Sequence, residues 1–130
     1  MRAEAPRATI SSVAATVLIV DDHAGFRSYA RALLVAEGFD VVGEATDGAS
    51  ALDLARLLEP ELVLLDVGLP DMDGFAVCDA LLEDGPGPAV VLTSSRDVSS
   101  YRRRLERSQA RGFIPKSELS GPALAALAGG

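Results

Sequence analysis

The sequence of 130 residues predicts one α/β domain, a doubly wound parallel sheet of five strands with five helices. Short apolar runs rich in β-branched residues alternate with segments whose apolar residues recur at helical spacing, the pattern of consecutive βα units. The runs are almost entirely apolar, as expected when helices cover both faces of a sheet. Hydrophobic residues make up 48% of the chain, which is enough to form a core.

The first two βα units follow directly from this pattern. A strand is predicted over residues 16–20, and the helix after it should end at Gly38, which is typical of a helix C-terminus. A shorter strand at Val41 and Val42 follows. The next helix must stop before Pro60. The apolar positions that define the two helices are Phe26, Tyr29, Ala30, Leu33 and Leu34 in the first, and Ala49, Leu52, Ala55 and Leu58 in the second.

The remaining strands are predicted over residues 62–65, 89–92 and 112–115. Three helices are predicted between and after these strands. The fourth helix of the chain has the weakest amphipathic pattern, because arginines and serines surround its apolar residues. The last helix is expected over residues 119–127. The apolar positions are Phe75, Cys78, Leu81 and Leu82 in the third helix, which Gly85–Pro88 ends, and Val98, Tyr101 and Leu105 in the fourth.

Composition excludes several functions. The formal net charge of −7 argues against direct binding of nucleic acid, which needs a basic face. No stretch is apolar for long enough to span a bilayer, so no membrane contact is expected. The single cysteine, Cys78, cannot form an internal disulfide and fits a core position, which favours a cytoplasmic location. We interpret residues 1–15 as a flexible tail rather than a signal peptide.

Four of the predicted strands end in polar residues. Asp21 and Asp22 follow the first strand, Asp66 the third and Thr93 the fourth, and Lys116, the only lysine of the chain, follows the fifth. The carboxyl ends of parallel strands lie along one edge of a sheet, where α/β proteins bind ligands. We therefore expect these side chains to form one site.

The residue types of this site indicate phosphoryl transfer. Two carboxylates ~4 Å apart repel each other by ~4 kcal/mol at an effective dielectric constant of ~20, and a divalent cation removes that repulsion. Oxygen ligands select a hard ion, Mg²⁺ first, which also binds phosphate oxygens. The ammonium of Lys116 and the hydroxyl of Thr93 suit a phosphoryl group, and an aspartate can accept it as an acyl phosphate. The implied reaction is phosphoryl transfer to Asp66.

The chain resembles the receiver domain of two-component response regulators over residues 16–128. The resemblance implies a flavodoxin-like sheet with strand order 2-1-3-4-5. It covers nearly all of the 130 residues, so we expect no effector domain within them, whether they are a stand-alone receiver or a fragment. The motifs that carry it, each on a predicted strand end, are Val20-Asp21-Asp22, Asp66 with Leu69-Pro70 and Met72-Asp73-Gly74, Thr93-Ser94, and Gly112-Phe113 leading to Lys116.

The resemblance also implies a role for each site residue. Asp66 would accept a phosphoryl group from a sensor histidine kinase, in a phosphorelay that requires Mg²⁺. The ion would be bound directly by Asp22, Asp66 and the backbone carbonyl of Gly68, and through water by Asp21. Lys116 would pair with the phosphoryl group.

Thr93 and Phe113 match the family's switch residues, which move together on activation. The fourth helix, the fifth strand and the fifth helix would then present a changed surface to a partner protein or to a second copy of the chain. Such a domain is not an enzyme beyond taking part in its own phosphoryl transfer and autodephosphorylation. Asp21-Asp22-His23 and Phe26-Arg27 are similar to receivers that are fused to DNA-binding domains.

Two other functions stay open. An aspartate-nucleophile phosphatase has two aspartates two residues apart on its first strand, a spacing that Asp21-Asp22-His23 lacks. A module that binds partners without phosphorylation could keep the fold, and the arginine cluster at residues 102–104 departs from the usual receiver pattern. We interpret His23 as a surface residue at a helix start, because the chain has no second histidine for a transition-metal site.

Overall fold

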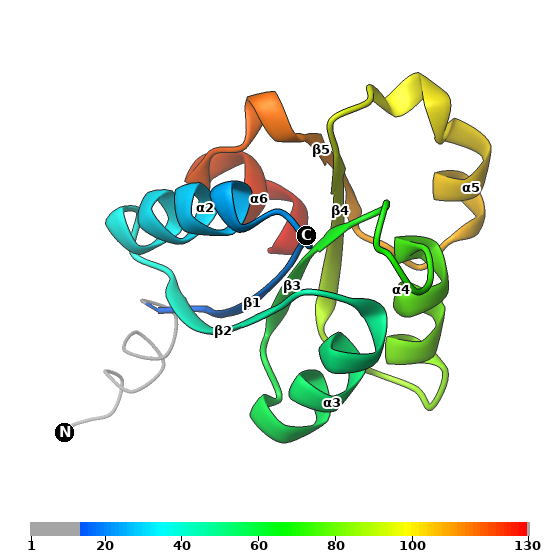
Figure 1. The fold of residues 1–130 in the computed structure, drawn as a ribbon, viewed down its shortest axis with the longest axis horizontal. Helices are drawn as coiled ribbons and strands as arrows, with labels where there is room; N and C mark the ends of the chain where they lie inside the picture. Colours follow the sequence, from blue (N-terminus) through cyan, green and yellow to red (C-terminus); the bar gives the residue numbers. More distant parts are fainter. Residues whose placement is uncertain (1–13, 130) are drawn as a thin grey trace, which may run out of the picture.

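The computed structural model describes residues 14–129, which form one parallel sheet of five strands covered by helices (Figure 1). The strand order is β2-β1-β3-β4-β5, as predicted, and every neighbouring pair is parallel. All carboxyl ends of the strands therefore lie at one edge. The strands are β1 (Thr16–Val20), β2 (Asp40–Ala45), β3 (Leu62–Asp66), β4 (Ala89–Ser94) and β5 (Gly112–Pro115).

Five α-helices lie on the two faces of this sheet. Figure 1 shows α2 and α6 on one side, and α3, α4 and α5 on the other. This arrangement makes the sheet doubly wound, and it confirms the predicted fold class. The helices are α2 (Ala24–Ala36), α3 (Gly48–Leu58), α4 (Gly74–Leu82), α5 (Arg102–Arg107) and α6 (Gly121–Ala128).

Side chains of each strand alternate between two apolar cores. In β1, Val17 and Ile19 pack with α2 and α6, while Leu18 and Val20 pack with α3 and α4. Strand side chains point to opposite faces in turn, so a strand buried on both faces must be apolar at every position. The continuous apolar runs seen in the sequence have this cause.

The last two helical regions differ from the prediction. One helix was predicted from Val98, Tyr101 and Leu105, but the segment forms a 3₁₀ turn, η1 (Val98–Ser100), and the short α5. Tyr101, with ψ near 7°, interrupts the helix, and the Asp97 carboxylate accepts the Ser99 N–H at 3.0 Å, which stabilises a turn instead.

The final helix α6 begins at Gly121 rather than at residue 119. Leu119 is extended, and the hydroxyl of Ser120 accepts the Ala123 N–H, so Ser120 is the N-cap and Pro122 lies in the first turn. A second 3₁₀ turn, η2 (Lys116–Glu118), fills the space between β5 and this cap.

Strand β2 is longer than the two residues predicted. It pairs with β1 from Asp40 to Ala45, with a register shift opposite Val17 and Leu18. β2 is an edge strand and exposes part of its length. Its sequence therefore includes Gly43 and Glu44, which interrupt the apolar run, and only Val41 and Val42 were predicted as strand.

Most of the expected N-terminal tail, residues 1–13, lies outside the described residues. Ala15 is already tied to the sheet, because its carbonyl accepts the Asp40 N–H at 2.9 Å. Among residues 14–129, no helix has the length and apolar character needed to cross a bilayer.

Candidate functional site

The structure brings the predicted strand-end residues together. Asp66 ends β3, the central strand, and lies in register with Thr93 of β4. Asp21 and Asp22 follow β1 on the other side of β3. The site therefore follows from the parallel sheet, without a special loop conformation.

The carboxylates form a compact group with one histidine. One ligand atom from each of Asp21, Asp22, His23 and Asp66 lies within 4.8 Å of the others. Asp21 is fully buried and Asp66 is only 4% exposed. Burial and the nearby negative charge of Asp21 raise the pKa of Asp66 above its ordinary value, and the opposing effect of Lys116 does not cancel them. The group thus holds more negative charge than its own surroundings neutralise.

Lys116 is the cation of this group. Its Nζ lies 2.7 Å from Asp21 Oδ2 and 3.6 Å from Asp66 Oδ2. The shorter contact is an ion pair, and the buried Asp21 Oδ2 accepts no hydrogen bond from any other residue that the structure describes. The ammonium also lies 4.7 Å from the centroid of the Phe26 ring on α2, a cation–π contact that helps to place it.

Thr93 is in register with Asp66, and Phe113 lies on the neighbouring strand β5; their side chains have different partners. The Thr93 hydroxyl is buried and donates to the Ile114 carbonyl of β5 at 2.7 Å. The Phe113 ring packs on Tyr101, with 5.7 Å between centroids. The Tyr101 hydroxyl in turn lies 3.3 Å from Ser94 Oγ, beside Thr93. Contacts therefore run from the strand end to the start of α5.

The loop after Asp66 is anchored at several points. The Gly68 N–H donates to Asp66 Oδ1 at 3.3 Å, and the Gly74 N–H donates to the Val67 carbonyl at 2.8 Å. Asp71 accepts the N–H groups of Gly48 and Ala49 at the start of α3, which lowers the pKa of its carboxyl group. The loop is thus tied to both of its neighbouring helices.

Asp73 fixes the far end of the loop. Its carboxylate caps α4 by accepting the Ala76 N–H at 3.0 Å, and it pairs with Arg104 of α5. The Arg104 guanidinium also lies 4.4 Å from the centroid of the Phe75 ring. Arg104, one arginine of the cluster at residues 102–104, therefore joins α5 to the loop.

Sequence reasoning missed three contacts of the site. The ring of His23 faces Asp21 and Asp22, Phe26 lies against Lys116, and Arg27 donates to the Asp21 carbonyl at 2.8 Å. His23 is exposed at the start of α2, as expected, but its ring nitrogen belongs to the carboxylate group. Only the adjacency of His23 to two aspartates signalled this position.

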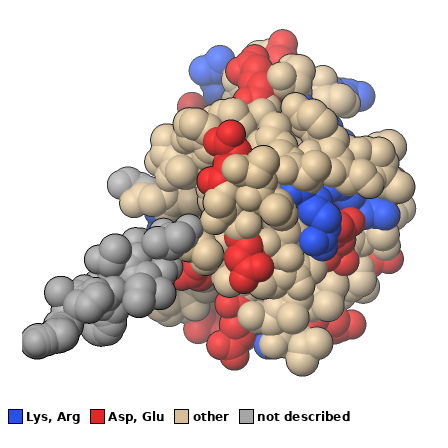
Figure 2. Space-filling model, turned by 90° about the vertical axis from the view of Figure 1, so that its left-hand side faces the viewer, with Lys and Arg blue, Asp and Glu red and all other residues tan. Residues whose placement is uncertain are grey.

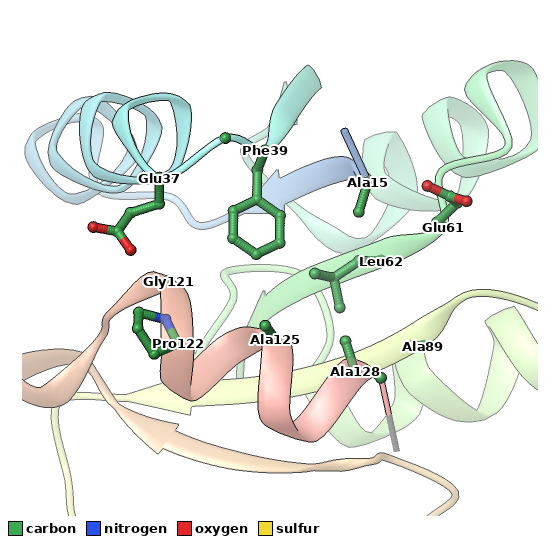
Figure 3. Close-up of a pocket in the computed structure, with 12 residues that line it drawn as sticks. Ala15, Glu37, Phe39, Glu61, Leu62, Ala89, Gly121, Pro122, Ala125 and Ala128 are labelled. Atoms are coloured by element: carbon green, nitrogen blue, oxygen red, sulfur yellow. The ribbon is translucent and has the colours of Figure 1, made fainter. Parts of the chain in front are cut away.

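A separate cavity of about 540 Å³ lies at the opposite edge of the sheet, between the end of α2 and α6 (Figure 3). Phe39, Leu62 and Ala125 line it, and Glu37 and Glu61 are its carboxylates. It contains none of the strand-end residues described above. The chemistry of the site therefore does not extend into this cavity.

Comparison with known proteins relates the chain to bacterial regulators. A family model described as "Response regulator receiver domain" matches residues 17–127. The transcription regulator BvgA of Bordetella pertussis is 40% identical over 102 residues, which cover 78% of this chain and 49% of BvgA. The nitrate/nitrite response regulator protein NarP of Escherichia coli is 40% identical over 77% of this chain and 47% of NarP. The chain thus spans about half the length of the curated relatives it matches.

A solved structure agrees with this relationship. The signal receiver domain of the response regulator NarL from Mycobacterium tuberculosis superposes with a TM-score of 0.79 at 35% sequence identity, covering 89% of this chain and 97% of that domain. The family match spans nearly all of the described residues, including every strand end of the site. The chain belongs to the response regulator receiver domain family.

Proposed function

We propose that this receiver domain is a phosphorylation-dependent signalling switch, in which Asp66 accepts a phosphoryl group from a sensor histidine kinase. The observation that carries the proposal is the position of Asp66, buried at the end of the central strand next to Asp21, with Lys116 Nζ 3.6 Å from its carboxylate. A carboxylate in such a place is costly unless it has a chemical role.

In the proposed reaction, a carboxylate oxygen of Asp66 attacks the phosphorus of the kinase's phosphohistidine. The P–N bond breaks, an acyl phosphate forms on Asp66, and the histidine leaves with the bonding electron pair. Lys116, 3.6 Å from Asp66 Oδ2, is close enough to pair with an oxygen of the transferred group. The domain would act on no other substrate, so we do not propose an enzyme beyond this transfer and the later loss of the phosphoryl group.

The carboxylate group fits a divalent cation. Three carboxylates lie within 4.8 Å of one another with Lys116 as their neighbouring ammonium, and the raised pKa of Asp66 reflects burial and negative charge that a cation would compensate. We propose that Asp22, Asp66 and the Gly68 carbonyl bind Mg²⁺ directly and that Asp21 binds it through water. The ion would supply positive charge against the phosphoryl oxygens.

The proposed switch uses Thr93 and Phe113. The Thr93 hydroxyl donates to the Ile114 carbonyl, away from Asp66, so turning toward a phosphoryl group must break this bond to β5. Phe113, packed on Tyr101, would move into the space that Thr93 leaves. The surface of α5, β5 and α6 would change as a result, and we propose it as the face for a partner protein or a second copy of the chain.

We propose that this reaction takes place in the cytoplasm, in agreement with the single cysteine of the chain. The relatives are named as transcription and response regulators, which supports a signalling role rather than catalysis on an external substrate.

The test is phosphorylation with a small-molecule donor. Acetyl phosphate and Mg²⁺ should add one phosphoryl group to the wild-type chain, detected by intact-mass spectrometry, and Asp66→Asn should add none. Asp84→Asn, which changes an exposed carboxylate remote from the site in sequence, is the matched control and should be labelled like the wild type. Equal labelling of wild type and Asp66→Asn would refute the proposal.

A further inference from the structure

The single histidine of the chain lies in the carboxylate group. Its Nδ1 is 3.1 Å from Asp21 Oδ1 and 3.2 Å from Asp22 Oδ1. The ring itself is open to solvent, since 69% of the side chain is exposed, whereas Asp21 is fully buried. The imidazole therefore covers the outer side of the group.

These spacings match the ligands of a metal ion. First-row divalent ions bind nitrogen and oxygen ligands at ~2.1 Å, so neighbouring ligands in an octahedral site lie ~3.0 Å apart and opposite ligands ~4.2 Å. The ring nitrogen stands at about the first spacing from two carboxylates, and all four ligand atoms lie within 4.8 Å. Small side-chain rotations would bring the group to these distances.

The two oxygens of the buried Asp21 carboxylate have different partners. Asp21 Oδ2 lies 2.7 Å from Lys116 Nζ and has no other polar partner among the described residues. A buried carboxylate oxygen normally accepts a hydrogen bond or contacts a cation. Lys116 thus contacts Oδ2, whereas Oδ1 faces His23, whose backbone N–H lies 2.8 Å and whose ring Nδ1 lies 3.1 Å from it.

We infer that His23 is a nitrogen ligand of the metal site, so that the site binds Ni²⁺ and Zn²⁺ more tightly than its oxygen ligands alone would. This inference rests on the metal site of the proposed function and adds one residue to it. Imidazole suits Ni²⁺ and Zn²⁺, while carboxylate, carbonyl and water suit Mg²⁺. For Nδ1 to bind the ion, the neutral ring carries its hydrogen on Nε2.

The alternative is that His23 only donates a hydrogen bond to the two carboxylates. In that case the ring does not bind the ion, and its removal changes the affinities for Mg²⁺, Ni²⁺ and Zn²⁺ by similar factors. A nitrogen ligand instead affects the imidazole-preferring ions selectively.

The test is calorimetric titration of tag-free protein with MgCl₂, NiCl₂ and ZnCl₂. His23→Ala should weaken Ni²⁺ and Zn²⁺ binding at least tenfold and change Mg²⁺ binding less than twofold. Gly25→Ala is the matched control in the same turn, because an added Cβ there meets no atom within 4 Å, and it should leave all three affinities unchanged. A similar change for the three ions in His23→Ala would overturn the inference.

A spectrum of the ring gives a second readout that does not depend on affinity. With one histidine in the chain, the ¹⁵N signals of the imidazole need no assignment, and Zn²⁺ should shift Nδ1 far more than Nε2. An unshifted Nδ1 at saturating Zn²⁺ would also overturn the inference. Asp22→Asn separates the two proposals: it should weaken all three ions, and if it and Asp66→Asn leave Mg²⁺ binding unchanged, the metal site of the proposed function is itself wrong.

Discussion

The charge on Asp66 destabilises the metal-free domain. Its pKa is raised by burial and by Asp21, so folding favours the protonated form. The stabilising contribution of this group is complete below the ordinary pKa of 3.8 and is lost as the pH rises through the higher pKa of the folded state. At neutral pH the ionised carboxylate is therefore a net cost.

Asp66→Asn should consequently raise the melting temperature at pH 7 without Mg²⁺. We expect a gain of a few degrees, equivalent to about 1 kcal/mol for a domain of this size. The gain should shrink as the pH is lowered toward 4, where the wild-type carboxyl group becomes neutral as well. Differential scanning calorimetry at several pH values tests this, and a lower melting temperature at pH 7 would contradict it.

The site residues at the strand ends could be predicted because their position depends only on chain order and on a parallel sheet. Asp66 and Thr93 are neighbours because of the strand register, which can be predicted without knowing where their side chains point. The contacts of His23 and Phe26 depend on how α2 is rotated above the sheet and on side-chain torsions. A linear pattern of residue types does not contain these quantities.

At the scale of elements, the start of α4 passes very close to the end of β3. A Cβ added at Gly74 would lie 2.5 Å from the Asp66 carbonyl oxygen and 2.8 Å from Val67 Cα, and backbone atoms cannot yield as side chains do. Gly68 lies in the same loop, and a Cβ there would meet no atom within 4 Å. A side chain therefore has room at position 68 but not at position 74.

Gly74→Ala should lower the free energy of unfolding by about 1–3 kcal/mol and reduce labelling of Asp66, because the strand end must shift. Gly68→Ala, the matched control, should change stability by less than about 0.5 kcal/mol. Urea unfolding and acetyl phosphate labelling measure both effects. Equal stability of the two variants would show that the loop relaxes without moving β3.

The pair of Arg104 and Asp73 joins α5 to the loop after β3. Burial opposes ionisation of Asp73, but hydrogen bonds from Arg104 and from the Ala76 N–H bring its pKa below the usual value. Both side chains are about half exposed, so the ion pair alone contributes little. The α5 helix is short and has no fully buried residue, which makes this contact important for its position.

Arg104→Ala should cost about 0.5–1 kcal/mol of stability, through loss of the ion pair and of the contact with Phe75. Asp73→Ala should cost more, about 1–2 kcal/mol, because it also removes the cap of α4. Asp73→Asn keeps a capping oxygen and should resemble Arg104→Ala. Urea unfolding ranks the three variants, and an Asp73→Asn as unstable as Asp73→Ala would contradict the separate contribution of the cap.

The least predictable element was the α5 region. Val98, Tyr101 and Leu105 have helical spacing, but the local hydrogen bond of Asp97 and the backbone of Tyr101 divide the segment. Short segments of weak amphipathicity are decided by such local competition and by packing. Strands buried on both faces, such as β3, were predicted almost to the residue. Their short, continuous apolar runs are typical of a strand that helices cover on both sides.

At the scale of the whole molecule, acidic groups exceed basic groups by seven. Figure 2 shows acidic side chains spread from top to bottom of one face, with basic side chains among them. Much of this charge is exposed and is screened by salt. The carboxylates of Asp21 and Asp66 are buried, and salt screens them much less. The two kinds of negative charge should therefore respond differently to cations.

Mg²⁺ should stabilise the folded chain by binding, and simple screening should not. At 100 times its dissociation constant, a ligand adds about 2.7 kcal/mol, or roughly 10 °C in melting temperature. NaCl at equal ionic strength is the control, and Asp22→Asn should lose most of the effect of Mg²⁺. An equal rise with NaCl would mean that surface screening accounts for the stabilisation.

The two-sided cores and the edge that holds the site could be derived from apolar periodicity and chain order. The strand order itself came from the family resemblance, because periodicity does not specify which strands are neighbours. The structure confirms that order and places β3 at the centre of the sheet.

Lys116 also allows lysine-specific reagents to act on the site at a single position. It is the only lysine of the chain, its side chain is 16% exposed, and its ammonium contacts Asp21 and Asp66. A lysine-specific protease can therefore cut the polypeptide at one peptide bond, directly after the residue that pairs with the acid cluster. The rate of that single cut reports how firmly the lysine is held, and an amine-reactive probe can label the same position in a chain whose only other primary amine is the N-terminus.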